Sequence, residues 1–577
     1  MKKITKTMCL CMAAAMATSS LAACGNVNGA DANTLVIKAY QGGYGSEVYE
    51  ELQRAWNAKN DAGEESFRVR IVGDPMLAQG FNAAIQSLNY GNSNNIADVY
   101  IIDSVGFNLL SRLKYVSGSY AGKYYFEDIT DVWTDEKYAW DGKTIVEKVD
   151  ESKAKNLKIN RETGNVDAVN GSYVYLPYSG GYTGFVYYKS YLESYAQELT
   201  SLGCTQFVDG KFVEPQTMQE FWELQKYISR LETNQISEDN KVYTFVNDLS
   251  SSSGYLPYMA DVFLMQVMGE EEYYKHVNFE GVTDVDTYNQ NFDDVDYAYE
   301  AMYNNVYKTG GDPASKSQTS FKNFDNATLT WNGLFIQKKG FFTINGDWSY
   351  NEARGYLAEN DVVDMMIIPL ACDVDTGKVI AKATPKAEAG LTDGADNEKY
   401  FKIETSKVDS SVIPEGEEND QYIYFKKIMN LNTGDVNLMI PAACKNVDNA
   451  KRFLSWIYSE EAGNIYTKFT GAMQPFNYTV TQDAYNSLSV FQKKTVDLSK
   501  SVTPLDTFSN IYTDIAIRSI LPLNAGLNDR WIYDIFSRSA ASHRSMMDTR
   551  KSAGKQKASN IQAEMDIYEL TVKNNNW

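Results

Sequence analysis

Hydrophobic residues recur along the chain in two alternating periods, which predict strands and helices in regular succession. An apolar run at residues 35–40 predicts a strand, and the helical spacing of apolar residues over 47–59 predicts a helix after it. The same pair recurs as a strand at 67–72 and a helix at 78–88, and a further apolar run at 97–103 predicts a buried strand. This order predicts a parallel sheet that is covered by helices on both faces.

The loops after the first and third of these strands are candidates for a ligand site. Ligands of such sheets bind beyond the carboxyl ends of the strands. Gln41 and Tyr44 lie in a glycine-rich loop after the first strand, and Asp103 ends the third strand. We therefore expect these residues at one edge of the sheet. The alternatives are that the glycine-rich loop is only a tight turn and that Asp103 only caps a helix.

A second set of elements follows a glycine-rich segment at residues 176–184. This segment is the best candidate for a crossing between two lobes, because it is short and rich in glycine. The later expected strands are 185–189, 340–348, 362–370 and 438–441, and the later expected helices are 217–231, 258–268, 290–310 and 447–459.

The N-terminus has the features of a secretory signal. Lys2 and Lys3 precede an apolar stretch of about ten residues, which is too short to cross the ~30 Å hydrocarbon core of a membrane. The sequence Leu-Ala-Ala-Cys at residues 21–24 resembles the lipobox of bacterial lipoproteins. That resemblance implies cleavage before Cys24, a diacylglycerol thioether on this cysteine, and a mature protein held on the outer face of a membrane. An ordinary signal peptide that contains a cysteine is the alternative.

The predicted organisation has two lobes, each built from more than one stretch of chain. A chain of 577 residues is long enough for more than one domain. The expected division is a signal peptide at 1–23, a lipid-anchored tether at 24–33, the first part of lobe 1 at 34–180, the first part of lobe 2 at 181–369, a return to lobe 1 at 370–470, and a return to lobe 2 with C-terminal helices at 471–577.

Charge and composition exclude several classes of partner. The formal net charge is −21, and it becomes about −24 when the lysines of the signal are removed. Affinity for nucleic acid depends on Lys and Arg side chains that meet phosphates, so we expect no nucleic-acid partner. The same charge argues against a broad cationic face for membranes. The 41 tyrosines combine an apolar ring with a polar tip, which suits wet contact surfaces, although most of them must pack at the rim of a core.

The sequence contains no motif for a metal, a cofactor or a familiar catalytic centre. Neither histidine, His276 or His543, has a second histidine four residues away, so the common zinc-protease motif is absent. The body's cysteines, Cys204, Cys372 and Cys444, are widely spaced and form no paired metal motif. The acidic run at 373–378 lacks a calcium ligand at its fifth position and predicts a hairpin turn instead. We therefore expect no cofactor.

Several segments, in this order along the chain, resemble motifs of the extracellular solute-binding proteins of ABC importers, in particular the carbohydrate-binding group that includes maltose-binding protein. The segments are GYTGFVYYK at 181–189, PQTMQEF at 215–221, TINGDW at 343–348, NAKRFLSWI at 449–457 and GAMQP at 471–475. The chain departs from the family at Met218, where Trp is usual, and in length. Residues 370–435 and those after 478 have no counterpart in the motifs.

This resemblance implies a two-lobe, periplasmic-binding-protein-like α/β fold with hinged lobes and a ligand cleft. It also implies a monomeric, surface-anchored binding protein, not an enzyme, that captures a carbohydrate such as an oligosaccharide and delivers it to the permease subunits of an ABC importer. The alternatives are the same fold with a peptide or another solute, a surface glycoside hydrolase that uses two carboxylates, and a glycan-capture lipoprotein that serves no transporter.

A sugar ligand suits particular side chains at the expected loops. An aromatic face can cover the apolar C–H side of a pyranose, and carboxylates and amides can bond its hydroxyls. We expect Trp348 to be the stacking platform and Asp103 to accept hydrogen bonds from hydroxyls. The alternative for Trp348 is a place in the core. The other expected ligand residues are Gln41, Tyr44, Tyr178, Tyr182, Asp347 and Gln474.

Overall fold

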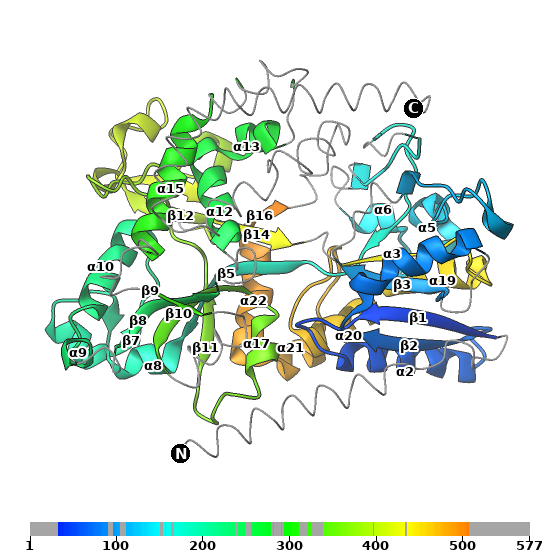
Figure 1. The fold of residues 1–577 in the computed structure, drawn as a ribbon. Coiled ribbons are helices and arrows are strands. Elements are labelled where there is room, and N and C mark those ends of the chain that lie inside the picture. The colour runs from blue at the N-terminus through cyan, green and yellow to red at the C-terminus, as the bar shows by residue number, and fades with distance from the viewer. Residues whose placement is uncertain are drawn as a thin grey trace. The chain divides into compact units, whose positions relative to one another are not determined.

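The structure is a computed structural model, and its well-placed residues lie between 33 and 506 (Figure 1). The predicted signal peptide, Cys24, nearly all of the tether and the predicted C-terminal helices after residue 506 lie outside the described residues. Within the range, the residues not described are 91–95, 104–110, 150–153, 156, 163–166, 237–240, 249–255, 278–280, 282–289, 291–293, 311–320, 325–337, 396 and 433–435.

The chain divides into two compact units. Unit 1 comprises Met1–Gly180 and Thr433–Ser487, and unit 2 comprises Gly181–Asn432 and Leu488–Trp577. The first change of unit falls inside the glycine-rich segment where a crossing was predicted. We describe each unit by itself.

Two of the predicted boundaries were wrong. Residues 370–432 belong to unit 2, although the sequence-based division assigned them to lobe 1, and residues 471–487 belong to unit 1. The reason is strand pairing. Strand β14 (Ile428–Asn432), at the end of the first segment, pairs with a central strand of the unit 2 sheet. In the second segment, Asn477 N donates to Lys148 O of unit 1 over 2.8 Å.

Unit 1 contains a five-stranded sheet in the order β2-β1-β3-β15-β4. Strands β1, β2 and β3 are parallel, as the alternating pattern predicted, and β15 lies antiparallel to β3 and β4. Figure 1 shows α3 on one side of this sheet and α2 with α20 on the other. The bounds are β1 Thr34–Tyr40, α2 Glu47–Asp61, β2 Arg68–Asp74, α3 Leu77–Ser87, β3 Val99–Asp103, α5 Thr130–Thr134, α6 Ile145–Lys148, β4 Leu176–Pro177, β15 Val436–Met439, α19 Val447–Ile457, α20 Glu460–Thr470 and α21 Gln482–Ser487.

Unit 2 contains a seven-stranded sheet in the order β16-β14-β5-β10-β8-β9, with β11 also paired to β5. Every residue of β5 and β10 is buried, which is typical of strands covered on both faces. The strands are β5 Gly181–Tyr188, β8 Tyr243–Asp248, β9 Phe321–Phe324, β10 Gly340–Gly346, β11 Val363–Met366, β14 and β16 Thr503–Asp506. The helices are α8 Lys189–Ser194, α9 Ala196–Ser201, α10 Met218–Ile228, α11 Glu232–Ile236, α12 Leu256–Met268, α13 Glu270–Val277, α15 Asp296–Gly310, α17 Ser349–Ala353, α18 Lys386–Ala389 and α22 Val490–Ser501.

Local sequence explains how two of these segments form. Helix α10 begins at Met218, after Thr217, whose side chain caps the helix together with Glu220 in a capping box; a helix was predicted to start here. The predicted turn at 373–378 is confirmed, since Gly377 N donates to Asp373 O over 2.9 Å and Gly377 has a φ of +70°. Small antiparallel pairs flank these elements, β6 (Phe207–Val208) with β7 (Lys211–Phe212) and β12 (Tyr400–Glu404) with β13 (Tyr422–Lys426).

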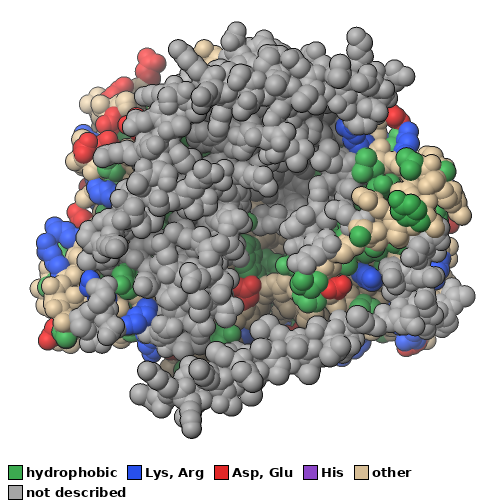
Figure 2. Space-filling view, in the orientation of Figure 1, with side chains coloured by type: hydrophobic (Ala, Val, Ile, Leu, Met, Phe, Trp, Pro, Cys, Tyr) green, Lys and Arg blue, Asp and Glu red, His purple; other side chains and the backbone are tan. Residues whose placement is uncertain are grey.

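The surface and the helices of the described part add two observations. On the face that Figure 2 shows, Lys and Arg side chains are interspersed with Asp and Glu, and no broad cationic patch is seen among the coloured residues. In the same part of the chain, no helix has both the length and the apolar character needed to cross a membrane.

Candidate functional site

In unit 1, the predicted residues of the first and third strands lie at one edge of the sheet. Strands β1 and β3 are parallel, with Lys38 beside Tyr100 and Ala39 beside Ile101. The loop that begins at Gln41 and the end of β3 at Asp103 therefore lie at the same edge, as predicted. Asp103 pairs through its backbone with Val436 of β15. The position of its side chain and the loop 104–110 lie outside the described residues.

Four tyrosines of unit 1 form a continuous series of ring contacts that begins at Tyr44, on the loop at this edge. Tyr44, on the loop after β1, lies edge-on to Tyr466 of α20, with ring centroids 6.0 Å apart. Tyr466 lies edge-on to Tyr178 at 5.4 Å, and Tyr178 stacks on Tyr49 at 6.1 Å. Tyr44 is partly exposed, whereas Tyr178 is buried. Of the two tyrosines of unit 1 that were predicted as ligand residues, only Tyr44 is therefore partly exposed.

Tyr178 and Gln474 are brought together although 296 residues separate them. Gln474 Nε2 donates to the Tyr178 carbonyl over 3.3 Å. Both side chains are buried, and within the described residues neither the Tyr178 hydroxyl nor Gln474 Oε1 has a hydrogen-bond partner. Burial, with smaller effects of Tyr49 and Tyr466, raises the pKa of Tyr178 well above its usual value. The phenol is therefore neutral at physiological pH and can donate a hydrogen bond.

In unit 2, Tyr182 and Asp347 hold two strand ends together. Tyr182 N donates to Asp347 Oδ2 over 3.2 Å, and Asp347 N donates back to Tyr182 O over 3.0 Å. Both residues are buried. The Asp347 carboxylate thus fixes the end of β10 against β5, immediately before Trp348.

Trp348 follows β10 and lies over the glycine at the end of that strand. A methyl group built on Gly346 would lie 2.2 Å from the indole ring, so the ring occupies the space that a side chain would fill. Trp348 is partly exposed and does not belong to the buried core cluster of unit 2. Trp348 is therefore not a core tryptophan of unit 2, and its role as a stacking platform stays a prediction.

Thr183 and Asn430, which were not among the predicted ligand residues, lie in one row across the unit 2 sheet together with Gly346. In the register of β14, β5 and β10, Asn430 pairs with Thr183, and Thr183 pairs with Gly346. Directly paired residues of antiparallel strands point to the same face, with Cβ atoms roughly 4.5–5.5 Å apart. The side chains of Asn430 and Thr183 and the Trp348 indole therefore share one face of the sheet.

These two residues are also unsatisfied. Asn430 and Thr183 are 0% exposed, and among the described residues no partner bonds Asn430 Oδ1, Asn430 Nδ2 or Thr183 Oγ1. Thr183 lay inside a recognised motif, but the motif gave no reason to select it. Asn430 lay in a strand that the sequence analysis did not predict. The available signal was a single amide at the centre of an otherwise apolar run, Ile428 to Leu431.

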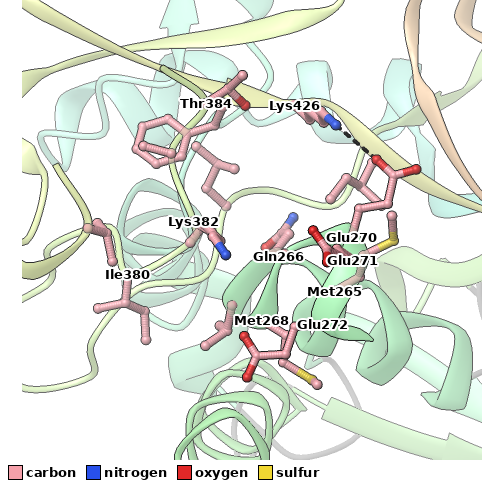
Figure 3. A pocket seen from close by; sticks show the side chains of 18 of the residues that line it. Met265, Gln266, Met268, Glu270, Glu271, Glu272, Ile380, Lys382, Thr384 and Lys426 are labelled. Carbon is pink, nitrogen blue, oxygen red and sulfur yellow. Dashed lines mark hydrogen bonds and ion pairs between the residues drawn. The ribbon is translucent and has the colours of Figure 1, made fainter. Parts of the chain in front are cut away.

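A separate cavity of about 1090 Å³ lies within unit 2 (Figure 3). Helices α12 and α13 line it together with residues of the segment 370–432, and Lys426 forms an ion pair with Glu270 over 2.8 Å at its rim. Glu271 and Glu272 also contribute to this rim. None of the predicted ligand residues lines this cavity. In the described part of the chain, no group of three acidic, histidine or cysteine side chains is placed to hold a metal ion.

Comparison with known proteins identifies the fold. No protein-family model matches the sequence, and no curated protein matches it. The cyclic α-maltosyl-1,6-maltose binding protein from Arthrobacter globiformis is similar in structure, with a TM-score of 0.50 and 11% identity over 92% of this chain and 99% of that one.

Other structures match with lower scores. RafE from Streptococcus pneumoniae has a TM-score of 0.49 and 12% identity over 93% of this chain and 99% of its own. UgpB from Mycobacterium tuberculosis, solved with glycerophosphocholine, has a TM-score of 0.49 and 12% identity over 92% and 98%. From the match to the Arthrobacter globiformis protein and the two α/β units described above, we conclude that the chain has the two-lobe α/β fold of the solute-binding proteins.

Proposed function

We propose that this protein is the solute-binding component of an ABC importer and that its solute is a carbohydrate. The observation that carries the proposal is the row of Trp348, Thr183 and Asn430 on one face of the unit 2 sheet. An indole can cover the apolar face of a sugar ring, while a hydroxyl and an amide that bond no described residue can bond the hydroxyls at its edge. The protein of similar fold from Arthrobacter globiformis is described as a binder of a cyclic maltosyl-maltose, which supports this choice.

The residues of unit 1 that we propose as ligand residues lie at the edge of its sheet. Gln41 and Tyr44 are partly exposed there, and Asp103 ends the neighbouring strand. Tyr178 and Gln474 carry buried polar atoms that bond no described residue, so they are proposed as hydrogen-bonding groups. Tyr182 and Asp347 of unit 2 are proposed to act mainly by positioning Trp348, because Tyr182 N donates to the Asp347 carboxylate and Asp347 N donates to Tyr182 O.

A thermal-shift screen tests the proposal. A ligand that binds only the folded protein stabilises it by RT ln(1 + [L]/Kd), about 2.7 kcal/mol at a hundredfold excess over Kd. The panel should contain maltotriose, cellotriose, mannotriose, xylotriose and raffinose, their monosaccharides, and a set of tripeptides and tetrapeptides. We expect at least one oligosaccharide to raise the melting temperature by several degrees. A response to peptides alone, or release of reducing ends from an oligosaccharide by the purified protein, would contradict the proposal.

We further propose that Cys24 carries a lipid that holds the protein on the outer face of the membrane, beside the permease subunits that receive the sugar, and that the protein works as a monomer. The support is the sequence of residues 21–24 with its basic and apolar leader. Cys24→Ser should abolish lipid attachment, so the protein should leave the membrane fraction or remain unprocessed. Fractionation and intact-mass measurement check this result. Unchanged membrane retention and unchanged mass of the processed variant would exclude the anchor.

A further inference from the structure

We propose that Asn430 and Thr183 recognise two neighbouring hydroxyl groups on the sugar ring that stacks on Trp348. This inference rests on the proposed function and adds the chemical feature of the sugar that the site selects. It assigns specificity to a residue of the segment 370–432, which has no counterpart in the recognised sequence motifs.

The strand register places the three groups in order. Asn430 on β14, Thr183 on β5 and Gly346 on β10 are consecutive partners across the sheet, and the Trp348 indole fills the space above Gly346. Adjacent members of such a row are roughly 5 Å apart at Cβ. A sugar ring stacked on the indole would therefore turn one edge toward Thr183 and Asn430.

The absence of partners within the described residues is what distinguishes Asn430 from an ordinary buried amide. Most buried polar groups are bonded, and a buried group that lacks a partner destabilises the folded protein. Other buried amides in unit 2 follow the rule. Asn234, for example, accepts from Val242 N over 2.6 Å and donates to the carbonyls of Ile228 and Val242. At Asn430 both the carbonyl oxygen and the amino group remain unbonded to any described residue, so a ligand could bond both.

The chemistry of a carboxamide favours a pair of neighbouring hydroxyls. Asn presents one acceptor oxygen and one amino donor side by side. Two adjacent hydroxyls of a pyranose present a donor and an acceptor at a similar spacing, so one amide can bond both. The Thr183 hydroxyl can donate or accept and lies between this amide and the indole. A site built on such bonds rejects an analogue that lacks one hydroxyl, because its own polar groups are then left unpaired.

The test compares isosteric variants with a matched control. Thr183→Val and Asn430→Leu keep the heavy-atom branching of each side chain and remove its polar groups. Thr244→Val is the control, since Thr244 is equally buried, has an unbonded hydroxyl within the described residues and belongs to β8 of the same sheet, two strands from β5. Calorimetry should use the panel sugar among maltotriose, cellotriose, mannotriose, xylotriose and raffinose that stabilises the wild type most.

We expect Asn430→Leu to weaken binding of that sugar by about ten- to a hundredfold and Thr183→Val by about tenfold, while Thr244→Val leaves affinity unchanged. Without sugar, Asn430→Leu should keep or raise the melting temperature, because it removes an unbonded buried amide. Monodeoxy forms of the same sugar should bind the wild type weakly and bind Asn430→Leu no worse than the parent sugar.

The outcomes separate the two proposals. If the wild type binds a panel sugar and Asn430→Leu binds it equally well, the inference is wrong and the proposed function stands. If Asn430→Leu lowers the melting temperature strongly without sugar and Thr183→Val leaves affinity unchanged, Asn430 is a structural residue and the inference is wrong. If no panel sugar binds the wild type, the proposed function fails, and the inference fails with it.

Discussion

Replacement of Trp348 by alanine should weaken carbohydrate binding by about 2 kcal/mol or more, roughly thirtyfold, with little change in the melting temperature of the free protein. The expected loss is large because the indole supplies the main apolar contact of the proposed site. The expected stability is near normal because Trp348 is partly exposed and lies outside the buried core cluster of unit 2. Calorimetric titration with a panel sugar and thermal unfolding without sugar measure the two quantities on one variant.

Two further variants sharpen this prediction. Gly346→Ala should reproduce the binding loss, because its methyl group would lie 2.2 Å from the indole and force the ring to move. Trp222→Ala is the contrasting control. Trp222 is buried in unit 2 and donates to Thr309 Oγ1 over 3.2 Å, so its loss should destabilise the fold by about 3–5 kcal/mol. A collapse of stability in Trp348→Ala, or normal sugar affinity in that variant, would show that Trp348 is a packing residue.

Replacement of Asp364 by asparagine should destabilise unit 2 by about 3 kcal/mol. Asp364 is 2% exposed and accepts from Lys189 Nζ over 2.9 Å and from the Tyr187 hydroxyl over 3.2 Å, and Lys494 Nζ lies 3.2 Å away. Removal of one partner from a buried ionic group leaves the other charges without compensation, which typically costs about 3–5 kcal/mol. The lower value applies because both lysines retain some contact with solvent and Lys494 also pairs with Glu214.

Scanning calorimetry of Asp364→Asn checks this expectation, and an exposed ion pair provides the control. Lys468 and Asp483 lie 2.8 Å apart on the surface of unit 1, so Asp483→Asn should change the melting temperature little. The network of Asp364 joins α22 to β5 and β11, so its loss should lower the unfolding temperature of unit 2 in particular. Equal melting temperatures for the two variants would contradict the assigned role of Asp364.

The parts of the fold that the sequence predicted are those set by local periodicity. The alternation of strands and helices over residues 34–103 predicted the three parallel strands of unit 1, because each element is long and its apolar spacing is regular. The helix start at Thr217 was recognisable because a capping box needs only Thr217 and Glu220, three residues apart.

The errors concern features that depend on pairing between distant segments. Residues 370–432 were placed in the wrong lobe because nothing local shows that β14 pairs with β5, which lies about 250 residues earlier. Asn430 was missed for the same reason, since its importance follows from the register with Thr183. Exposure was also difficult to predict: Tyr44 is partly exposed and Tyr178 is buried, although each lies near a strand end. A single sequence does not show what packs over a strand end.

Hydrogen–deuterium exchange with and without a saturating panel sugar tests the central claim most directly, because it reports where the sugar acts. We expect slower exchange at the sheet edge of unit 1 and at that of unit 2, and unchanged exchange around the cavity of unit 2 that α12 and α13 line. The segments expected to be protected are 40–46, 466–474, 181–183, 346–349 and 428–432, and the control segment is 265–272. Protection confined to 265–272, or no protection in any of these segments while calorimetry shows binding, would contradict the account.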